Sequence, residues 1–226
     1  MAKMVPESED RHSSGAFDPV AEQYDRWYDS PEGAPIYAAE VSCLLSVFPS
    51  TATRWLEVGV GTGRFARALN VKLGIDPSPA MVTVAARRGI RTVRAIGEGL
   101  PCRTGAFDGV LMVASLCFIS DPVRALEESR RVLCPGGWLL IGHIPADGPW
   151  GRAYIEKGKT GHPVYSHARF TTVNQLESLV AAQGFTLRGA ASALFWSPEG
   201  TPEEPARIEQ GIVQGAGFVA LPFTAA

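Results

Sequence analysis

The chain has 226 residues, of which 46% are hydrophobic and 19% are charged, and its formal net charge is −2. This length and apolar content suffice for one α/β domain with a buried core. The near-neutral charge argues against broad nucleic-acid binding, which needs a basic surface, and no uninterrupted apolar run is long enough to span a bilayer. We therefore expect a cytoplasmic protein with neither a nucleic acid nor a membrane as its partner.

The four cysteines are scattered, with no C-x-x-C pair and no Cys/His spacing typical of a zinc site. We expect reduced thiols and no metal centre. Residues 1–16 are polar and lack both hydrophobic periodicity and the apolar core of a signal peptide, so we expect them to be disordered. Residues 17–226 are expected to form a single domain.

Two helices are expected before the first strand. Residues 17–28 are rich in aromatic side chains, and Asp18 followed by Pro19 is typical of a helix start. Residues 35–48 carry apolar side chains at broadly helical spacing. On the simplest interpretation, the aromatic side chains of the first helix cover an edge of the domain.

The central half of the chain alternates apolar strand patterns with helical patterns. Strand patterns cover residues 54–58, 71–75, 92–96, 109–113 and 138–142. Helical patterns cover residues 64–69, 80–88 and 123–133. This alternation predicts βαβ units and a largely parallel sheet with helices on both faces. Right-handed crossovers then place a ligand crevice at the carboxyl ends of the strands.

A glycine-rich turn joins the first strand to its helix. Gly59, Gly61 and Gly63 follow Glu57 on alternate positions. Glycine permits positive φ and close backbone approach, so such a turn can present N–H groups to a ligand at a helix N-terminus. A dinucleotide-binding fingerprint would place its third glycine where this chain has Arg64. The triplet by itself is also compatible with a purely structural turn.

An acidic residue ends the second strand. Asp76 follows Gly74 and Ile75 and precedes the sequence Pro77-Ser78-Pro79, in which Ser78 is a candidate helix cap. A carboxylate here can accept hydrogen bonds from both hydroxyls of a ribose. Asp76 therefore favours a nucleoside ligand over a solvated loop position, without choosing between a nicotinamide cofactor and another nucleoside.

Further motifs follow in a fixed order. They are Gly97-Glu98-Gly99-Leu100-Pro101, the strand Phe107–Ala114, and a helix end, Pro-Gly-Gly turn and strand within Arg131–Ile141. Together with the glycine turn and Asp76, they closely resemble a class I S-adenosylmethionine (SAM)-dependent methyltransferase of the kind called methyltransferase type 11. The match runs from about Phe17 to Gly142.

The resemblance implies a Rossmann-like, doubly wound α/β fold. Its sheet would be mostly parallel and seven-stranded, with helices on both faces and an antiparallel last strand. SAM would be the cofactor, and its methyl group would pass to a small-molecule acceptor by SN2 displacement, for which orientation and exclusion of water matter most. Residues 17–48 would form lid helices over the cofactor.

The resemblance also implies site residues. Glu57 would lie near the methionine ammonium, the glycine backbone would pass under the methionine and ribose, and Asp76 would bind the ribose hydroxyls. The implied cofactor-binding residues are Tyr24, Glu57, Gly59, Gly61, Gly63, Asp76, Pro77, Met81, Gly97, Glu98, Val113, Ala114 and Cys117. Relatives usually have an aspartate where this chain has Ile96, so adenine recognition would depend on a backbone carbonyl or on Glu98.

The likeness weakens in the part that would meet the acceptor. Residues 143–171 are expected to form an acceptor-side insertion, because so long a connection is usually functional or mobile. His143 stands at the mouth of the fifth strand and is a candidate for acid–base chemistry, although a lone histidine more often has a structural role. Tyr28, Tyr165 and Arg169 are candidate substrate contacts.

The C-terminal part completes the expected sheet. Thr172 and Gln175 form a capping box that opens a helix ending near Gly184. Strands are expected over residues 186–195 and 217–223, separated by a polar excursion.

Two other functions remain open at this point. One is a nicotinamide-dependent oxidoreductase on a Rossmann sheet, and the other is a non-catalytic SAM-binding module. No sequence pattern predicts the acceptor, the methylated atom or the oligomeric state.

Overall fold

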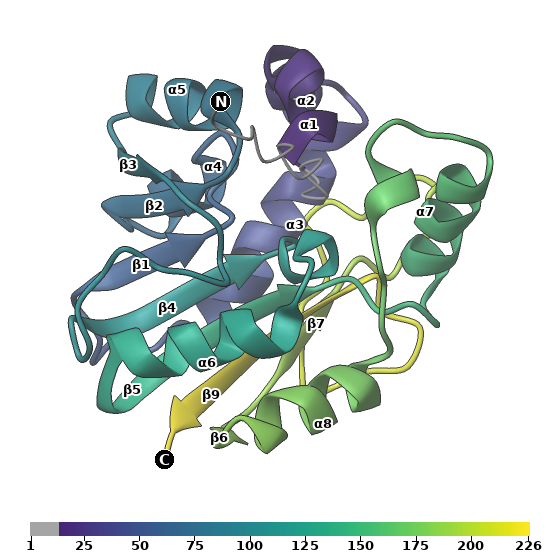
Figure 1. Ribbon diagram of the computed structural model, residues 1–226. Coiled ribbons are helices and arrows are strands. Elements are labelled where there is room, and N and C mark those ends of the chain that lie inside the picture. Colours follow the sequence, from purple (N-terminus) through teal and green to yellow (C-terminus); the bar gives the residue numbers. More distant parts are fainter. Residues whose placement is uncertain (1–13) are drawn as a thin grey trace, which may run out of the picture.

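The computed structural model describes residues 14–226 and shows a twisted sheet with helices on both faces (Figure 1). Its strands are β1 (Trp55–Val58), β2 (Leu73–Asp76), β3 (Arg91–Arg94), β4 (Phe107–Val113), β5 (Leu133–His143), β6 (Phe185–Leu187), β7 (Ala191–Ala193), β8 (Glu209–Gln210) and β9 (Phe218–Ala225). The strand order is β3-β2-β1-β4-β5-β9-β7-β8, and β6 also pairs with β9. Strands β1 to β5 pair in parallel, whereas β9 runs antiparallel to β5.

The doubly wound fold with an antiparallel last strand is confirmed, but the sheet of the described residues has nine strands where seven were expected. The expected strand over residues 186–195 is divided into β6 and β7, which pair with successive parts of β9. Leu187 pairs with Phe223, and Ala191 pairs with Ala220. The two paired positions are thus four residues apart on this side but only three residues apart on β9. One extra residue therefore forms a β-bulge. The polar excursion ends in the short edge strand β8, which adds the other strand.

Helices cover both faces of the sheet. The described helices are α1 (Ser14–Phe17), α2 (Ala21–Trp27), α3 (Gly33–Ser46), α4 (Arg64–Ala68), α5 (Pro79–Arg87), α6 (Pro122–Val132), α7 (Pro149–Lys159) and α8 (Val173–Ala182). Residues of α3, α4 and α5 join one apolar cluster, and residues of α6 and α8 join the other. Thr172 and Gln175 form the expected capping box at the start of α8. None of the helices within residues 14–226 combines the length and apolar character needed to cross a membrane.

The first described helices lie over the glycine turn. Of the segment expected to be disordered, residues 1–13 lie outside the described part, while residues 14–16 belong to α1, where Phe17 packs edge-on against Phe118. The sequence suggested that Asp18 caps its own helix, but the structure shows no such cap. Its carboxylate instead accepts hydrogen bonds from the Ser78 hydroxyl and, at 3.3 Å, from the Ala80 amide at the start of α5.

Ion pairs fasten α2 to the turn. Arg64, directly after the last glycine, pairs with Asp25 at 2.9 Å and with Asp29 at 2.5 Å. Arg88 pairs with Asp25 from the other side at 2.8 Å. The hydroxyl of Tyr37 on α3 also donates to the backbone carbonyl of Arg64 at 2.9 Å. Arg64, which stands where a dinucleotide-binding fingerprint would have its third glycine, thus anchors the N-terminal helices.

Substitution of Leu126 by alanine should destabilise the protein by about 2–5 kcal/mol, because this fully buried side chain of α6 packs between helix and sheet and its loss leaves a cavity. Val123→Ala, on the exposed side of the same helix, should change the free energy of unfolding by less than about 0.5 kcal/mol. Urea unfolding measures both values. Equal effects would contradict the assignment of α6 as a helix with one buried face.

His143 ends β5, and its Nε2 shares a 2.9 Å hydrogen bond with the Thr171 carbonyl. Burial lowers its pKa to about 4. The unfolded chain therefore binds more protons between about pH 4 and 6.5, so the unfolding free energy falls as the pH falls through this range, by a few kcal/mol in order of magnitude. In His143→Gln, which keeps an N–H donor, this contribution should disappear.

Thermal unfolding between pH 4.5 and 7.5 measures that difference against the wild type. His167→Gln, at an exposed position of the same segment, is the matched control. An unchanged pH dependence in His143→Gln would contradict the structural role given to His143.

Candidate functional site

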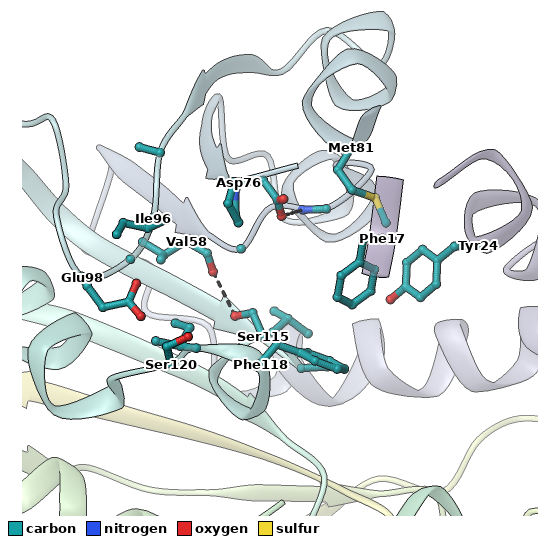
Figure 2. A pocket seen from close by; sticks show the side chains of 18 residues that line it. Phe17, Tyr24, Val58, Asp76, Met81, Ile96, Glu98, Ser115, Phe118 and Ser120 are labelled. Atoms are coloured by element: carbon teal, nitrogen blue, oxygen red, sulfur yellow. Dashed lines mark hydrogen bonds between the residues drawn. The ribbon is translucent and has the colours of Figure 1, made fainter. Parts of the chain in front are cut away.

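A crevice opens at the carboxyl ends of β1, β2 and β4, where the parallel strands were expected to place one (Figure 2). Its lining residues are Phe17, Tyr24, Val58, Gly59, Gly61, Asp76, Pro77, Met81, Ala95, Ile96, Gly97, Glu98, Val113, Ala114, Ser115, Phe118, Ile119 and Ser120. Figure 2 shows Phe17, Tyr24 and Phe118 gathered at one end, and Ile96, Glu98 and Ser120 at the other. One end is thus aromatic, and the opposite end offers a carboxylate and a hydroxyl.

The glycine turn forms the floor of the crevice. Gly59, Gly61 and Gly63 have φ of +75°, +51° and +79°, a region that side chains disfavour. A Cβ on Gly59 would lie 2.4 Å from the Cβ of Ser115, so this position requires glycine for packing. A Cβ on Gly61 would meet nothing within 4 Å. The backbone at Gly61 therefore faces open space at the crevice.

Asp76 is held in place by the backbone. Its Oδ2 accepts from the Gly61 amide and its Oδ1 from the Ser78 amide, both at 2.9 Å. Burial raises the pKa of Asp76, while these two hydrogen bonds oppose the rise. Each carboxylate oxygen can accept a further hydrogen bond. The side chain is thus fixed toward the crevice with free acceptor capacity.

Glu57 lies outside the crevice lining, within the core at β1, where it is 1% exposed. Its Oε2 has no hydrogen-bond partner within residues 14–226. Burial raises the pKa of Glu57 well above its ordinary value, although a hydrogen bond from the Ala66 backbone opposes this rise. An unpartnered buried carboxyl oxygen is costly, so a cation bound nearby would stabilise the ionised form.

A second, larger cavity adjoins the crevice. Its volume is about 590 Å³, within the usual range for ligand sites. Four residues, Phe17, Tyr24, Ala114 and Phe118, line both spaces. The cavity's other aromatic lining residues are Trp27, Tyr28, Trp150, Tyr154, Tyr165, Phe170 and Trp196. The two spaces therefore meet at a common wall, and an aromatic chamber opens beyond it.

The cavity wall is built from segments far apart in the chain. Tyr24 and Tyr28 share a 2.8 Å hydrogen bond between their hydroxyls. Tyr154 of α7 stacks on Tyr165 with ring centroids 4.4 Å apart. Ala114, at the wall between the two spaces, has φ of +47°, an uncommon conformation for a residue with a side chain. Residues of the segment 143–171 thus face those of the N-terminal helices across the cavity.

Most residues expected at the site come together. Ten of them line the crevice, namely Tyr24, Gly59, Gly61, Asp76, Pro77, Met81, Gly97, Glu98, Val113 and Ala114. Tyr28, Cys117 and Tyr165 line the aromatic cavity instead, and burial raises the pKa of the Cys117 thiol to about 12.

Four expected residues line neither space. Glu57 is buried in β1, and Gly63, the last glycine of the turn, lies close to Ala85 and Ile90. His143 is buried against the Thr171 carbonyl, so its position does not support acid–base chemistry. Arg169 donates from its Nη2 to the carbonyls of Ile119 and Ser120 at 2.7 and 2.6 Å, which ties residues 143–171 to the crevice loop.

Several lining residues were not expected. Phe17, Ser115 and Phe118 line the crevice, and Glu40 lines the cavity. A signal for Glu40 was present, because it is an acidic residue among the buried positions of an otherwise apolar helix. Within residues 14–226, no group of His, Cys, Asp or Glu side chains is arranged to hold a metal ion.

Comparison with known proteins places the chain in a family. Residues 56–141 match the family model described as a methyltransferase domain. An uncharacterized protein of Mycobacterium tuberculosis is 42% identical over 201 residues, which are 89% of this chain and 70% of that protein. The demethylmenaquinone methyltransferase of Thermus thermophilus is 30% identical over 165 residues, covering 60% of this chain and 75% of the enzyme.

The same family appears among solved structures. A crystal structure from Thermotoga maritima, described as a SAM-dependent methyltransferase and possible histamine N-methyltransferase, has a TM-score of 0.87 and 32% sequence identity. The match covers 95% of this chain and 100% of that one. With the glycine turn, the crevice and these relatives together, the chain belongs to the SAM-dependent methyltransferases and is an enzyme whose cofactor is S-adenosylmethionine.

Proposed function

We propose that this enzyme transfers the methyl group of SAM to a small-molecule acceptor bound in the aromatic cavity. The observation that carries the proposal is the common wall: Phe17, Tyr24, Ala114 and Phe118 line both the crevice and the cavity. A cofactor in the crevice and an acceptor in the cavity would therefore meet there. SAM supplies a methyl carbon bonded to a positively charged sulfur.

The crevice residues fit this cofactor. Asp76 has free acceptor capacity for the ribose hydroxyls, and Pro77 and Met81 offer apolar surface for the adenine. Gly61 leaves room for close approach of the ligand to the backbone. The buried, unpartnered oxygen of Glu57 would be stabilised by a bound cation such as the methionine ammonium of SAM.

At the adenine end, Ile96 and Glu98 line the crevice together with Gly97. The resemblance implied an aspartate at this position, where the chain has the apolar Ile96. The Glu98 Oε1 accepts from the Asp121 amide at 3.1 Å, which holds this carboxylate at the crevice. We infer that Glu98 and nearby backbone carbonyls accept hydrogen bonds from the adenine amino group.

The residues at the common wall would orient the acceptor and exclude water from the reaction. Methyl transfer requires the acceptor, the methyl carbon and the sulfur to lie in line, with water excluded. The rings of Phe17, Tyr24 and Phe118 provide apolar surface on the aromatic side, and the N-terminal helices that carry two of them would act as a lid. A chamber of this size suits a small molecule in preference to a nucleic acid.

Titration of the purified protein with S-adenosylhomocysteine by calorimetry tests the cofactor site, with NADH as the control. We expect saturable binding in the micromolar range and no heat from NADH. At about a hundred times the dissociation constant, the ligand should add roughly 2.7 kcal/mol of stability, which thermal unfolding detects. Saturation by NADH without a response to S-adenosylhomocysteine would contradict the proposal.

Two glycine-to-alanine variants distinguish the effect of backbone strain on stability from the effect of a lost ligand contact on binding. Gly61 and Gly89 both have positive φ, and an added Cβ meets nothing within 4 Å at either position. Alanine at each should therefore cost about 1–2 kcal/mol of stability. Only Gly61→Ala, at the crevice, should weaken S-adenosylhomocysteine binding, by about tenfold or more (~1.4 kcal/mol). Equal affinities of the two variants, measured by calorimetry, would place the ligand elsewhere.

A further inference from the structure

A buried carboxyl group faces the aromatic cavity. Glu40 lies on α3 among the core residues Ile36, Cys43 and Leu44, is 6% exposed, and lines the cavity. Within residues 14–226, no hydrogen bond and no ion pair reaches its carboxyl group. Because Glu40 is buried and lines the cavity, a partner for its carboxyl group can approach from the cavity.

Tyrosines from three segments line the same cavity as this carboxyl group. Its negative charge contributes to the raised pKa values of Tyr24, Tyr28, Tyr154 and Tyr165, for each of which burial is the first cause. The hydroxyls of Tyr24 and Tyr28 bond to each other, and the rings of Tyr154 and Tyr165 stack on each other. Within the described part of the chain, the tyrosines therefore contact one another and donate no hydrogen bond to the Glu40 carboxyl group.

The isolated position of Glu40 has an energetic consequence. Burial raises its pKa to about 8. A carboxylate without a buried partner costs several kcal/mol to keep ionised, and an apolar residue of similar size would avoid this cost. A carboxyl group left in this state at the wall of a ligand-sized cavity is typical of a functional site.

The other titratable groups at the cavity do not supply a counter-charge. Lys157 is exposed, with its Nζ 5.7 Å from the ring centroid of Tyr154, and Glu32 is also exposed. The Nδ1 of His162 accepts from the Val164 and Tyr165 amides at 3.3 Å, and burial lowers the pKa of this imidazole, with Lys157 adding to the effect. Cys117 is a buried thiol whose pKa burial raises.

The chemistry of this wall selects a cation. A carboxylate gives an ammonium group a charge-assisted hydrogen bond, and the faces of tyrosine and tryptophan rings attract it through their quadrupoles. Both features are present on one cavity, with Trp27, Trp150 and Trp196 adding to the tyrosines. A hydroxyl or a carbon acid would gain much less from the aromatic rings.

We propose that the aromatic cavity binds a small organic amine in its ammonium form, with Glu40 as the counter-charge that positions its nitrogen. This inference rests on the proposed function, because the amine would be the methyl acceptor. The bound ammonium can pass one N–H proton to the Glu40 carboxylate, which becomes the neutral acid. The electron pair of that N–H bond then remains on nitrogen as the lone pair that a methyl acceptor needs.

Calorimetry with paired probes tests the proposal on the full chain saturated with S-adenosylhomocysteine. The probes are butylamine, 2-phenylethylamine and tryptamine, each paired with the alcohol of the same carbon skeleton. We expect at least one amine to bind tenfold or more tightly than its alcohol. Alcohols that bind as tightly as their amines throughout, or an absence of binding by all three amines at millimolar concentration, would overturn the proposal.

Glu40→Gln keeps the size of the side chain and removes its charge. In this variant the amine preference should fall to within about twofold, while S-adenosylhomocysteine binding persists. Glu127→Gln, at an exposed position on α6, is the control and should keep the preference. A preference retained in Glu40→Gln would overturn the role of Glu40.

A measurement on the wild type remains decisive if that variant does not fold. Because Glu40 must ionise to pair with the ammonium, and its pKa lies near 8, amine binding at pH 7 should release close to one proton, and affinity should fall up to tenfold per pH unit as the pH falls further. Binding heats in buffers of different ionisation enthalpy measure this release. The alcohols should release no proton, and an amine that releases none would contradict the proposal.

Different outcomes would overturn the amine site and the proposed methyl transfer. Binding of S-adenosylhomocysteine without any preference for amines would overturn the amine inference alone. Amine binding that depends on Glu40, in a protein that does not bind S-adenosylhomocysteine at hundreds of micromolar, would overturn the proposed methyl transfer alone.

Discussion

The ion pairs of Asp25 with Arg64 and Arg88 determine the form of the site, because they hold the N-terminal helices over the glycine turn. Burial alone would raise the pKa of Asp25, but the hydrogen bonds from the two guanidinium groups lower it to about 2. Arg64 follows Gly63 directly. One turn therefore supplies the floor of the crevice and, one residue later, the anchor for the helices above it.

This anchoring places aromatic side chains where two spaces meet. Phe17 and Tyr24 come from the N-terminal helices, and Phe118 comes from the loop after β4. The segment between β5 and α8 contributes further rings to the cavity wall, including that of Tyr154. Arg169 ties this segment to the crevice loop. The glycine turn and the strand ends thus line the crevice, while the N-terminal helices and residues 143–171 shape the cavity that we propose for the acceptor.

The sequence predicted the parts of the site that depend on short, local motifs. The glycine turn and Asp76 follow their strands directly, and strand ends meet at one edge of a parallel sheet. The sequence indicated Tyr28, Tyr165 and residues 143–171 for the acceptor side, but not that they line one cavity, because its wall combines segments more than a hundred residues apart. His143 was located correctly at a strand end, but sequence position does not reveal that its ring turns toward the Thr171 carbonyl. The bulge between β6 and β7 likewise depends on pairing with a distant strand.

We propose that methyl transfer takes place where the crevice and the aromatic cavity meet, at Ala114. A crystal structure of the complex with S-adenosylhomocysteine tests this claim most directly. We expect both ribose hydroxyls to lie within hydrogen-bond distance of Asp76, and the sulfur to face the aromatic cavity past Phe17, Tyr24 and Phe118. A sulfur that points away from this cavity, or a ligand bound outside the crevice, would contradict this arrangement.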